Sequence, residues 1–333
     1  MINCAIVGAT GLVGKTFLKV LEEKNLSIDN FFLLASSSSK GKKVRFLGDE
    51  YIVEVLNENT FENTKFDYAL FSAGGDISKK YIPLAVKSGC VVIDNSSIFR
   101  MKENVPLIVP EVNLEDLSFC TNNIIANPNC STIQAVVALK PLHDKYTLKR
   151  VIYSTYQAVS GAGKKGLDDL ENTTKGLESK SFPYRIYNNC IPQIDMFLEN
   201  GYSKEEMKII EETKKILHLP KLKLTATAVR CPIKNCHGES INVEFESAFD
   251  ILDVRQLLSK SPGIALLDDV SRSLYPLNTF ADNKNDVFIG RLRRDFSIPN
   301  GLNFWCVADN LRKGAATNAV QILEKLLQKR QEN

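Results

Sequence analysis

Cys130 is the residue whose position most strongly suggests catalytic chemistry. It lies in the polar turn Asn127-Pro-Asn-Cys-Ser-Thr132, directly before the helical pattern of Ile133–Leu139. A helix N-terminus favours a thiolate, because free N–H groups and the helix dipole stabilise negative charge and lower the thiol pKa. The alternative is a structural cysteine that packs as a small hydrophobic residue. We apply that structural interpretation to five other cysteines: Cys4, Cys90, Cys120, Cys190 and Cys306.

A glycine-rich turn near the N-terminus could hold a phosphate group. The segment Gly8-Ala-Thr-Gly-Leu-Val-Gly14 connects an apolar run to a helical pattern. Glycines let the backbone approach a pyrophosphate, whose charge then meets the N–H groups at the helix start. The spacing differs from the G-x-G-x-x-G fingerprint, so an ordinary glycine-rich turn remains the alternative. The candidate cofactor-binding residues of the turn are Gly8, Thr10, Gly11, Leu12, Val13 and Gly14.

The loop after the second expected strand favours NADP over NAD. An NAD site usually has an acidic residue there to bind the ribose hydroxyls. Here the strand runs into four serines, Ser36–Ser39, followed by Lys40-Gly-Lys-Lys43. Hydroxyl groups and cations suit a 2′-phosphate, and the alternative is a solvated surface loop. The candidate residues are Ser36, Ser38 and Ser39.

A metal site is not predicted. Cys231, Cys236 and His237 are close in sequence, but an adjacent cysteine and histidine are hard to aim at one ion. Their spacing matches no common zinc set, and no fourth ligand is evident.

The elements that must position these residues change character near residue 130. Before it, short apolar strands alternate with helices, which predicts a Rossmann-type, doubly wound, mainly parallel sheet. The expected strands are Asn3–Val7, Phe31–Ala35, Phe66–Phe71, Val91–Ile93 and Ile124–Ala126, and the helices include Gly14–Glu23 and Tyr81–Ser88.

After residue 130, longer alternating strands predict an α+β domain with a mixed sheet that has helices on one face. We place a nucleotide-binding domain at 1–129, completed by a C-terminal helix within 314–333, and a second domain at 130–313. The expected strands of the second domain are Arg150–Tyr156, Lys223–Arg230, Ser240–Phe245, Asp286–Arg293 and Gly301–Cys306; its helices lie near 131–146, 164–175 and 203–218, and the terminal helix is Gly314–Gln328.

Composition supports a soluble enzyme of two domains. The 333 residues are 44% hydrophobic and 24% charged with a net charge of +3, which argues against disorder, and no basic block indicates nucleic-acid binding. No apolar run approaches the ~18 residues of a membrane span. The N-terminus lacks the basic region of a secretory signal, and the scattered cysteines indicate reduced thiols, so we expect a cytoplasmic protein.

Several motifs together resemble the aspartate-β-semialdehyde dehydrogenase family, and they match in order along essentially the whole chain. The resemblance implies NADPH-dependent reduction of aspartyl phosphate to aspartate semialdehyde with release of phosphate, in lysine, threonine, methionine and diaminopimelate biosynthesis. It also implies a homodimer, with a tetramer as the alternative. The motifs are the glycine turn, SSIFRM at 96–101, NPNCST at 127–132, YQAVSGAG at 156–163, ETKK at 212–215, VRCPIKNCHG at 229–238 and ADNLRKGAA at 308–316.

The resemblance also assigns roles to residues. Cys130 is the nucleophile that forms a thioester, His237 is the acid/base and Gln157 holds the substrate. Arg230 binds the substrate carboxylate, and Glu212 orients the substrate amine or Arg230. Arg100 and Lys215 bind phosphate, Asn129 joins this substrate-binding group, and Ser160, Gly161 and Asn310 contact the cofactor.

We also make three predictions about individual residues. We expect His143 and His218 to be surface residues, and a turn around Pro232 to bring His237 back towards Arg230. Without the resemblance, Glu212 and Lys215 would be an exposed helical i,i+3 pair.

The sequence departs from the family pattern at Ser38, where an arginine is common, and at Asn310, where a glutamine is common. Both departures concern cofactor affinity. The alternatives to this function are an N-acetyl-γ-glutamyl-phosphate reductase, which shares the cysteine–histidine chemistry, and a catalytically silent nucleotide-binding paralogue.

Overall fold

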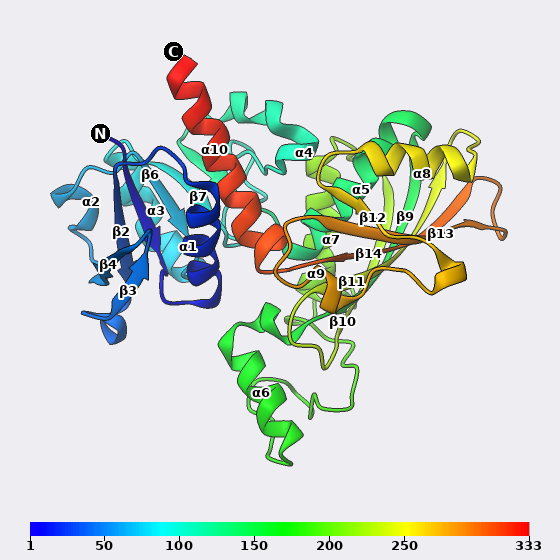
Figure 1. Cartoon of the computed structure of the whole chain (residues 1–333), viewed down its shortest axis with the longest axis horizontal. Helices are drawn as coiled ribbons and strands as arrows, with labels where there is room; N and C mark the ends of the chain where they lie inside the picture. The colour runs from blue at the N-terminus through cyan, green and yellow to red at the C-terminus, as the bar shows by residue number, and fades with distance from the viewer. Residues whose placement is uncertain (333) are drawn as a thin grey trace. The chain divides into compact units, whose positions relative to one another are not determined.

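The computed structural model describes residues 1–332, and the chain divides into two compact units (Figure 1). The first unit is Met1–Pro128 together with the chain from Ala315 onward, and the second is Asn129–Gly314. Within residues 1–332, every helix is too short or too polar to cross a lipid bilayer.

The first unit is built on a six-stranded, fully parallel sheet, which confirms the predicted doubly wound architecture. The strand order is β5-β2-β1-β6-β7-β8, so the order reverses direction between β1 and β6. In such sheets a ligand binds beyond the carboxyl ends of the strands at this switch point. The strands are β1 (Asn3–Val7), β2 (Asn30–Ala35), β5 (Glu54–Val55), β6 (Tyr68–Phe71), β7 (Val91–Asp94) and β8 (Ile124–Ala126).

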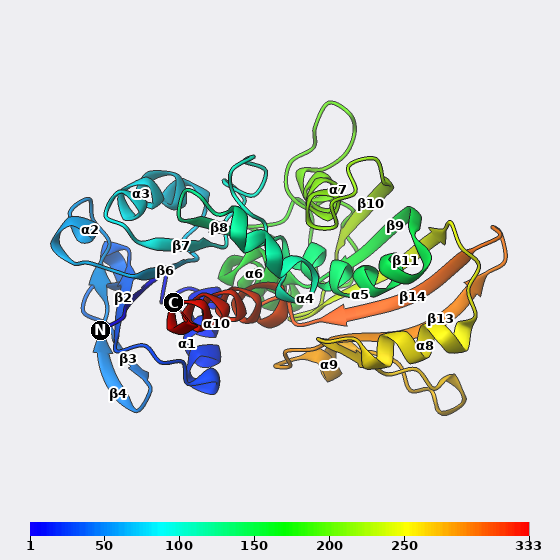
Figure 2. The same ribbon diagram turned by 90° about the horizontal axis from the view of Figure 1, so that it is seen from above.

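Helices cover both faces of this sheet (Figure 2), with α1 (Leu12–Lys24) and α10 (Thr317–Glu332) on one side and α3 (Gly75–Lys87) on the other. The side chains of β1 alternate between the faces, and Cys4 and Ile6 join α1 and α10 in one hydrophobic cluster. The C-terminal helix begins three residues later than expected, after a π-helical turn at Arg312–Ala316. Two shorter helices are α2 (Thr60–Asn63) and α4 (Pro110–Asn113).

A hairpin that the sequence did not predict follows the serine loop. Strands β3 (Lys43–Phe46) and β4 (Asp49–Ile52) pair antiparallel, so Lys43 lies in a strand and not in the loop. One side of the hairpin packs on the core, where Phe46 is fully buried and Val44 and Tyr51 contact the same cluster. The alternation of polar and apolar residues covers only Lys43–Phe46, and four residues is the shortest run that indicates a strand.

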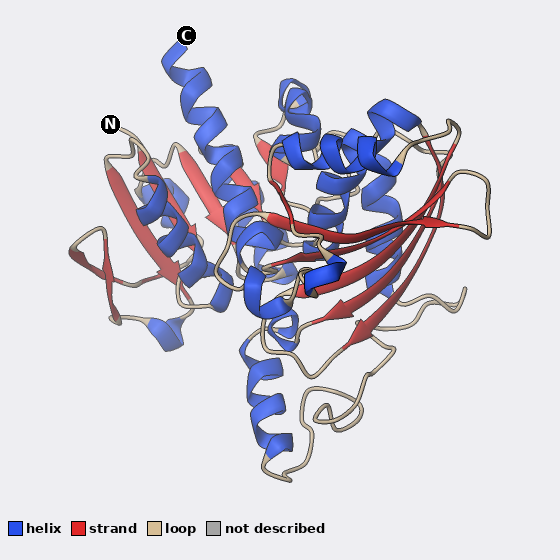
Figure 3. Cartoon of the chain, turned by 45° about the vertical axis from the view of Figure 1, so that its right-hand side comes forward, coloured by secondary structure: helices blue, strands red, loops and turns tan. Residues whose placement is uncertain are grey.

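The second unit contains a mixed sheet, as predicted; it has six strands in the order β10-β9-β11-β14-β13-β12. Figure 3 shows helices packed on one face of this curved sheet. The helices of that face are α5 (Cys130–Tyr146), α7 (Lys204–Ile216) and α8 (Ile251–Lys260), and the unit also contains α6 (Lys164–Thr174) and α9 (Asn278–Ala281). The strands are β9 (Leu148–Gln157), β10 (Lys223–Arg230), β11 (His237–Phe245), β12 (Ile264–Leu266), β13 (Val287–Asp295) and β14 (Gly301–Ala308).

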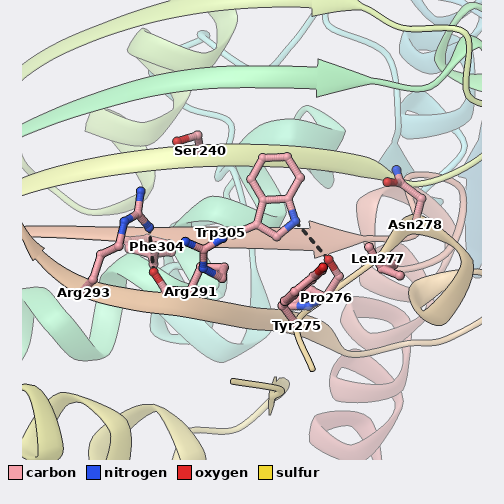
Figure 4. A pocket seen from close by; sticks show the side chains of 9 residues that line it. All are labelled: Ser240, Tyr275, Pro276, Leu277, Asn278, Arg291, Arg293, Phe304 and Trp305. Atoms are coloured by element: carbon pink, nitrogen blue, oxygen red, sulfur yellow. Dashed lines mark hydrogen bonds between the residues drawn. The ribbon is translucent and has the colours of Figure 1, made fainter. Parts of the chain in front are cut away.

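The opposite face of this sheet carries polar and aromatic side chains. Tyr156 is 40% exposed, and its ring centroid lies 5.5 Å from that of Trp305. The Trp305 indole N–H donates to the carbonyl of Pro276 at 3.1 Å, and both residues line a pocket together with Arg291 and Arg293 (Figure 4).

Candidate active site

Three predicted site residues of the second unit come from the ends of neighbouring strands. Strand β9 lies between β10 and β11 and ends at Gln157, which is in register with Arg230 at the end of β10. Strand β11 starts at His237 on the other side of β9. The chain therefore crosses the end of β9 between Arg230 and His237, which confirms the expected turn.

Asn129 fixes the start of helix α5 and thereby the position of Cys130. Its Oδ1 accepts the backbone N–H groups of Ser131 at 2.9 Å and Thr132 at 3.3 Å, which is the N-cap arrangement. The backbone N–H of Asn129 donates to the carboxylate of Glu212 at 2.6 Å. Cys130 is the first helical residue and is partly exposed. A Cβ at Gly314 would lie 2.9 Å from the Cys130 Cβ, so only glycine allows this approach.

Arg230 is a buried cation beside Cys130. Its Nη1 donates to the carbonyl of Ala158 at 2.7 Å, and the side chain is 6% exposed. Burial lowers its pKa, whereas the nearby Glu205 and Cys130 raise it. The guanidinium keeps its charge under all physiological conditions and can bind a carboxylate in bidentate fashion.

His237 is held as a neutral imidazole with a defined tautomer. Its Nδ1 accepts the backbone N–H of Ala158 at 3.0 Å, so the ring proton is on Nε2. The side chain is fully buried, and among residues 1–332 Nε2 has no hydrogen-bond partner. Burial, followed by the charge of Arg230, lowers the pKa of His237 to about 3. At neutral pH the ring can therefore donate one hydrogen bond from Nε2.

The other two histidines differ from each other. His218 is exposed, as expected. The expectation was wrong for His143, which is half-buried and accepts the backbone N–H of Leu148 at 3.2 Å because it stands in the last turn of α5.

Gly161 packs against both Arg230 and His237. A Cβ at this position would lie 2.8 Å from Nη1 of Arg230 and 3.3 Å from the His237 ring. The absence of a side chain therefore leaves room for the two residues to meet.

Gln157 belongs to a buried network that includes an acid the sequence analysis missed. Its Nε2 donates to the hydroxyl of Ser131 at 2.6 Å and to Glu205 at 3.0 Å. Asn129 also donates to Glu205, at 2.8 Å, and Lys208 lies 3.3 Å from it. Burial alone would raise the pKa of Glu205, but Lys208 and the two amide donors outweigh it and the pKa is lowered. Glu205 is therefore a buried anion.

The position of Glu205 on helix α7 was a signal that the sequence analysis did not use. Glu205 and Glu212 are seven residues apart, which places them on one face of the helix. Both are buried, so the exposed-pair alternative for Glu212 is excluded, while Lys215 is half-buried. Another buried acid, Glu239, follows His237 by two residues, and burial raises its pKa well above the usual range.

Ser160 and Asn310 are paired with each other. The two side chains lie 3.0 Å apart (Asn310 Nδ2 to Ser160 Oγ), and the Asn310 Oδ1 accepts the backbone N–H of Cys236 at 2.9 Å. Cys236 has a left-handed φ of 70° in the turn before His237.

One group of side chains in the described chain has ligand atoms close enough for a metal ion: Cys236, Asp282 and Asp309, all within 4.8 Å of one another. Asp309 already accepts the backbone N–H groups of Asn283 and Leu311, at 2.9 and 2.8 Å. The cluster is thus explained as part of a turn, and it carries no metal assignment.

In the first unit, the glycine turn follows β1 as predicted. Gly8 has a φ of 85°, and a Cβ there would lie 2.8 Å from the carbonyl of Ser72. A Cβ at Gly14 would lie 2.1 Å from the Gly8 carbonyl. Gly11 is the N-cap of α1, so Leu12 and Val13 present the N–H groups of its first turn. A cavity lies beside the turn and extends to Ser36 and Ser72.

The serine loop folds onto this turn. The Thr10 and Ser39 hydroxyl oxygens are 3.1 Å apart, and those of Ser36 and Ser38 are 2.9 Å apart. The Lys42 ammonium lies 3.3 Å from the Ser39 hydroxyl.

Arg100, a predicted phosphate-binding residue, also belongs to the first unit. It is buried and donates to the carbonyl of Asn95 at 2.9 Å.

One of the five cysteines expected to pack as small hydrophobic residues does not. Cys190 is exposed in the loop between α6 and α7, whereas Cys120 is partly exposed but packs against the core of the first unit. Cys4, Cys90 and Cys306 are fully buried.

Comparisons with known proteins agree with this arrangement. Residues 3–119 match the family described as "Semialdehyde dehydrogenase, NAD binding domain", and residues 139–313 match "Semialdehyde dehydrogenase, dimerisation domain". An aspartate-semialdehyde dehydrogenase of Aquifex aeolicus is 52% identical, with 97% of each chain covered.

Solved structures show the same likeness. Aspartate semialdehyde dehydrogenase II of Vibrio cholerae, complexed with ASA, superposes with a TM-score of 0.94 at 46% identity over 98% of both chains. A Candida albicans aspartate semialdehyde dehydrogenase with NADP gives a TM-score of 0.77 at 25% identity, also over 98% of both chains. This chain belongs to the aspartate-semialdehyde dehydrogenase family.

Proposed function

We propose that the protein reduces aspartyl phosphate to aspartate semialdehyde and releases phosphate, with Cys130 as the nucleophile. The observation that carries the proposal is the grouping of Cys130 at a capped helix start with a buried Arg230 and a neutral, buried His237. A thiol, a carboxylate-binding cation and a proton donor are what acyl transfer from an aspartyl acyl phosphate requires.

The protein residues divide the chemistry between them. The Cys130 thiolate attacks the acyl carbon, the bond to phosphate breaks, and a thioester remains on the sulfur. When bound, NADPH supplies the hydride that reduces the thioester to the aldehyde level. His237 holds its proton on Nε2, where it can donate a hydrogen bond to the oxyanion of the tetrahedral adduct, whose collapse expels the Cys130 thiolate.

Recognition of two anions is assigned to the cations. Arg230 binds the α-carboxylate of the substrate, while Arg100 and Lys215 bind the phosphate. Glu212 and Asn129 orient these groups, and Gln157 holds the substrate beside Cys130. The burial of Glu212 and its bond to the backbone of Asn129 support a positioning role for both.

The first unit fits a nicotinamide dinucleotide. Gly8 and Gly14 keep the turn free of side chains, and the first turn of α1 offers N–H groups to a pyrophosphate. The residues that would hold it are Gly8, Thr10, Gly11, Leu12, Val13, Gly14, Ser36, Ser38 and Ser39 in the first unit, and Ser160, Gly161 and Asn310 in the second.

We assign NADP as the preferred cofactor. The segment Ser36–Lys43 contains no acidic residue that would repel a 2′-phosphate, and Lys42 already lies beside Ser39. Ser38→Arg should lower the KM for NADP by roughly 10-fold or more and leave the KM for NAD unchanged, because a charge-assisted hydrogen bond contributes about 1.5–3 kcal/mol. Steady-state kinetics with both cofactors test this, and an unchanged NADP KM would show that the loop does not contact the 2′-phosphate.

We propose a homodimer formed through the open face of the second unit's sheet. The match of this unit to a family described as a dimerisation domain supports it, as does the exposed Tyr156 next to Trp305. We place the protein in the cytoplasm, where cysteines stay reduced, since all eight cysteines are unbonded thiols.

The function is tested by phosphate-dependent reduction of NADP, with aspartate semialdehyde and N-acetyl-glutamate semialdehyde as competing substrates. We expect turnover of aspartate semialdehyde, and none for Cys130→Ala, whose NADP affinity should stay within a few-fold of wild type. Turnover of the N-acetylated substrate alone would replace the proposed substrate, and an active Cys130→Ala enzyme would remove the thioester mechanism.

A further inference from the structure

Two cysteines outside the catalytic group lie in contact. The sulfur atoms of Cys190 and Cys231 are 3.8 Å apart, although 40 residues separate them in sequence. Cys190 is exposed and Cys231 is buried. Cys231 directly follows Arg230, and its backbone N–H donates to the carbonyl of Gln157 at 2.9 Å. The pair therefore adjoins two of the site residues.

The backbone holds the two cysteines in a geometry that suits a disulfide. Ile191 and Arg230 form an antiparallel bridge in which each N–H donates to the other's carbonyl, at 2.9 and 2.8 Å. The next opposed pair along such a bridge, Cys190 and Cys231, is the non-hydrogen-bonded one, for which the Cα atoms are typically about 4.5 Å apart. Disulfides span Cα separations of about 4.4–6.8 Å, so side-chain rotation can bring the sulfurs to bonding distance.

We propose that Cys190 and Cys231 are a redox-active pair that a low-molecular-weight disulfide, such as oxidised glutathione, converts to an intramolecular disulfide. The bond fixes the connection between α6 and α7, residues 175–203, to the end of β10 beside Arg230. The site is separate from the thioester chemistry at Cys130 and does not depend on it.

The reaction proceeds by two thiol–disulfide exchanges. The Cys190 thiolate attacks oxidised glutathione, forming a mixed disulfide and releasing one glutathione thiolate. Cys231 then gives up its proton and attacks the Cys190 sulfur, which releases the second glutathione. In sum, two protein thiols are oxidised and one oxidised glutathione is reduced to two molecules of glutathione.

Exposure decides the order of these steps. Burial, together with Cys190, raises the pKa of Cys231 to about 12, so Cys231 is a poor first nucleophile and reacts only with a partner in contact. Cys190 is the thiol that solvent-borne oxidants can reach. The fully buried Cys4 and Cys90 offer no such access.

Peptide mapping without reduction tests the pair directly. The full-length protein is equilibrated in glutathione buffers of increasing oxidised fraction, quenched in acid, alkylated and digested with trypsin. We expect a disulfide-linked product that joins peptide 186–204 to peptide 231–234. Half of this product should form at a ratio of oxidised to reduced glutathione at least 10-fold lower than the ratio at which half of Cys120 is modified. Cys190→Ser should abolish the joined peptide, and Cys120→Ser, the matched control, should leave it unchanged.

Two outcomes of the same experiment would contradict the proposed disulfide. A mixed disulfide that accumulates on Cys190 without linkage to Cys231 would overturn the proposal. So would alkylation of both thiols at ratios where Cys120 is already modified. Neither result requires turnover, so the test is independent of the proposed catalytic function.

Discussion

At the scale of single residues, the tautomer of His237 determines what its buried imidazole can contribute to the proposed reaction. The backbone N–H of Ala158 occupies Nδ1, which leaves the proton on Nε2, and burial keeps the ring neutral. The residue is therefore ready to donate throughout the physiological pH range, and its own protonation does not limit activity there.

Removing Nε2–H should slow the chemical step more than substrate binding. In His237→Asn, the amide oxygen can still accept the Ala158 N–H while the distal donor is lost. We expect kcat to fall by roughly 10²–10⁴, the usual contribution of general acid–base catalysis, with a smaller change in KM. His218→Gln, at an exposed position, is the matched control and should keep both constants. A loss expressed mainly in KM would instead make His237 a binding residue.

The lowered pKa of His237 also makes stability depend on pH. An unfolded histidine titrates near 6.5, whereas the folded pKa is about 3, so between these values the unfolded chain binds a proton that the folded chain does not. The free energy of unfolding should therefore fall as the pH drops from 6.5 towards 3, by up to about 1.4 kcal/mol per pH unit from this residue. The free energy of unfolding, measured with urea between pH 4 and 7, should depend more steeply on pH for wild type than for His237→Asn. Equal slopes would contradict the buried neutral state.

At the scale of elements, helix α7 supports the site by aiming two acids from one face. Glu205 accepts from Gln157 and Asn129, and Glu212 accepts from the Asn129 backbone, so the helix positions the end of β9 and the start of α5 together. These contacts join three elements that are far apart in sequence.

Glu205→Gln should weaken catalysis through this network. The amide loses the negative charge that both amide donors and Lys208 face, and hydrogen bonds to a charged group contribute about 1.5–3 kcal/mol. We expect kcat/KM for aspartate semialdehyde to fall by roughly 10- to 100-fold, while the KM for NADP changes little. Glu211→Gln, on the exposed side of the same helix, is the control. Equal effects of the two variants would indicate a general loss of helix stability.

The elements also show what the sequence could and could not predict. Alternating and apolar runs predicted most strands and main helices of both sheets, because burial of one or both faces leaves a periodic pattern. The β3–β4 hairpin left only the four-residue alternation of Lys43–Phe46, the shortest run that indicates a strand. Strand order was likewise invisible: no local signal says that β9 lies between β10 and β11. Glu205 was missed because a buried acid at helical spacing looks like any solvated charge until its partners are known.

At the scale of the whole molecule, the chain leaves the first unit after Pro128 and returns to it at Ala315. The segment between them is inserted between two parts of one hydrophobic core, since α10 contributes Val320 and Leu323 to the cluster that contains β1 and α1. The first unit is therefore complete only when the last helix of the chain has been made.

The open sheet face should determine assembly. Side chains on the helix-covered face of this sheet are buried, whereas Tyr156 on the open face is 40% exposed beside Trp305, which is an unusual place for aromatic rings unless another surface covers them. Tyr156→Glu adds a charge that would be buried without a partner in the dimer, which costs several kcal/mol, but that water solvates in the monomer. Light scattering coupled to size exclusion should therefore report the dimer mass for wild type and the monomer mass for Tyr156→Glu. Tyr184→Glu, at a residue that is 71% exposed in a loop, should keep the dimer mass. A dimer that tolerates Tyr156→Glu and dissociates with Tyr184→Glu would move the interface from the sheet to the 175–203 connection.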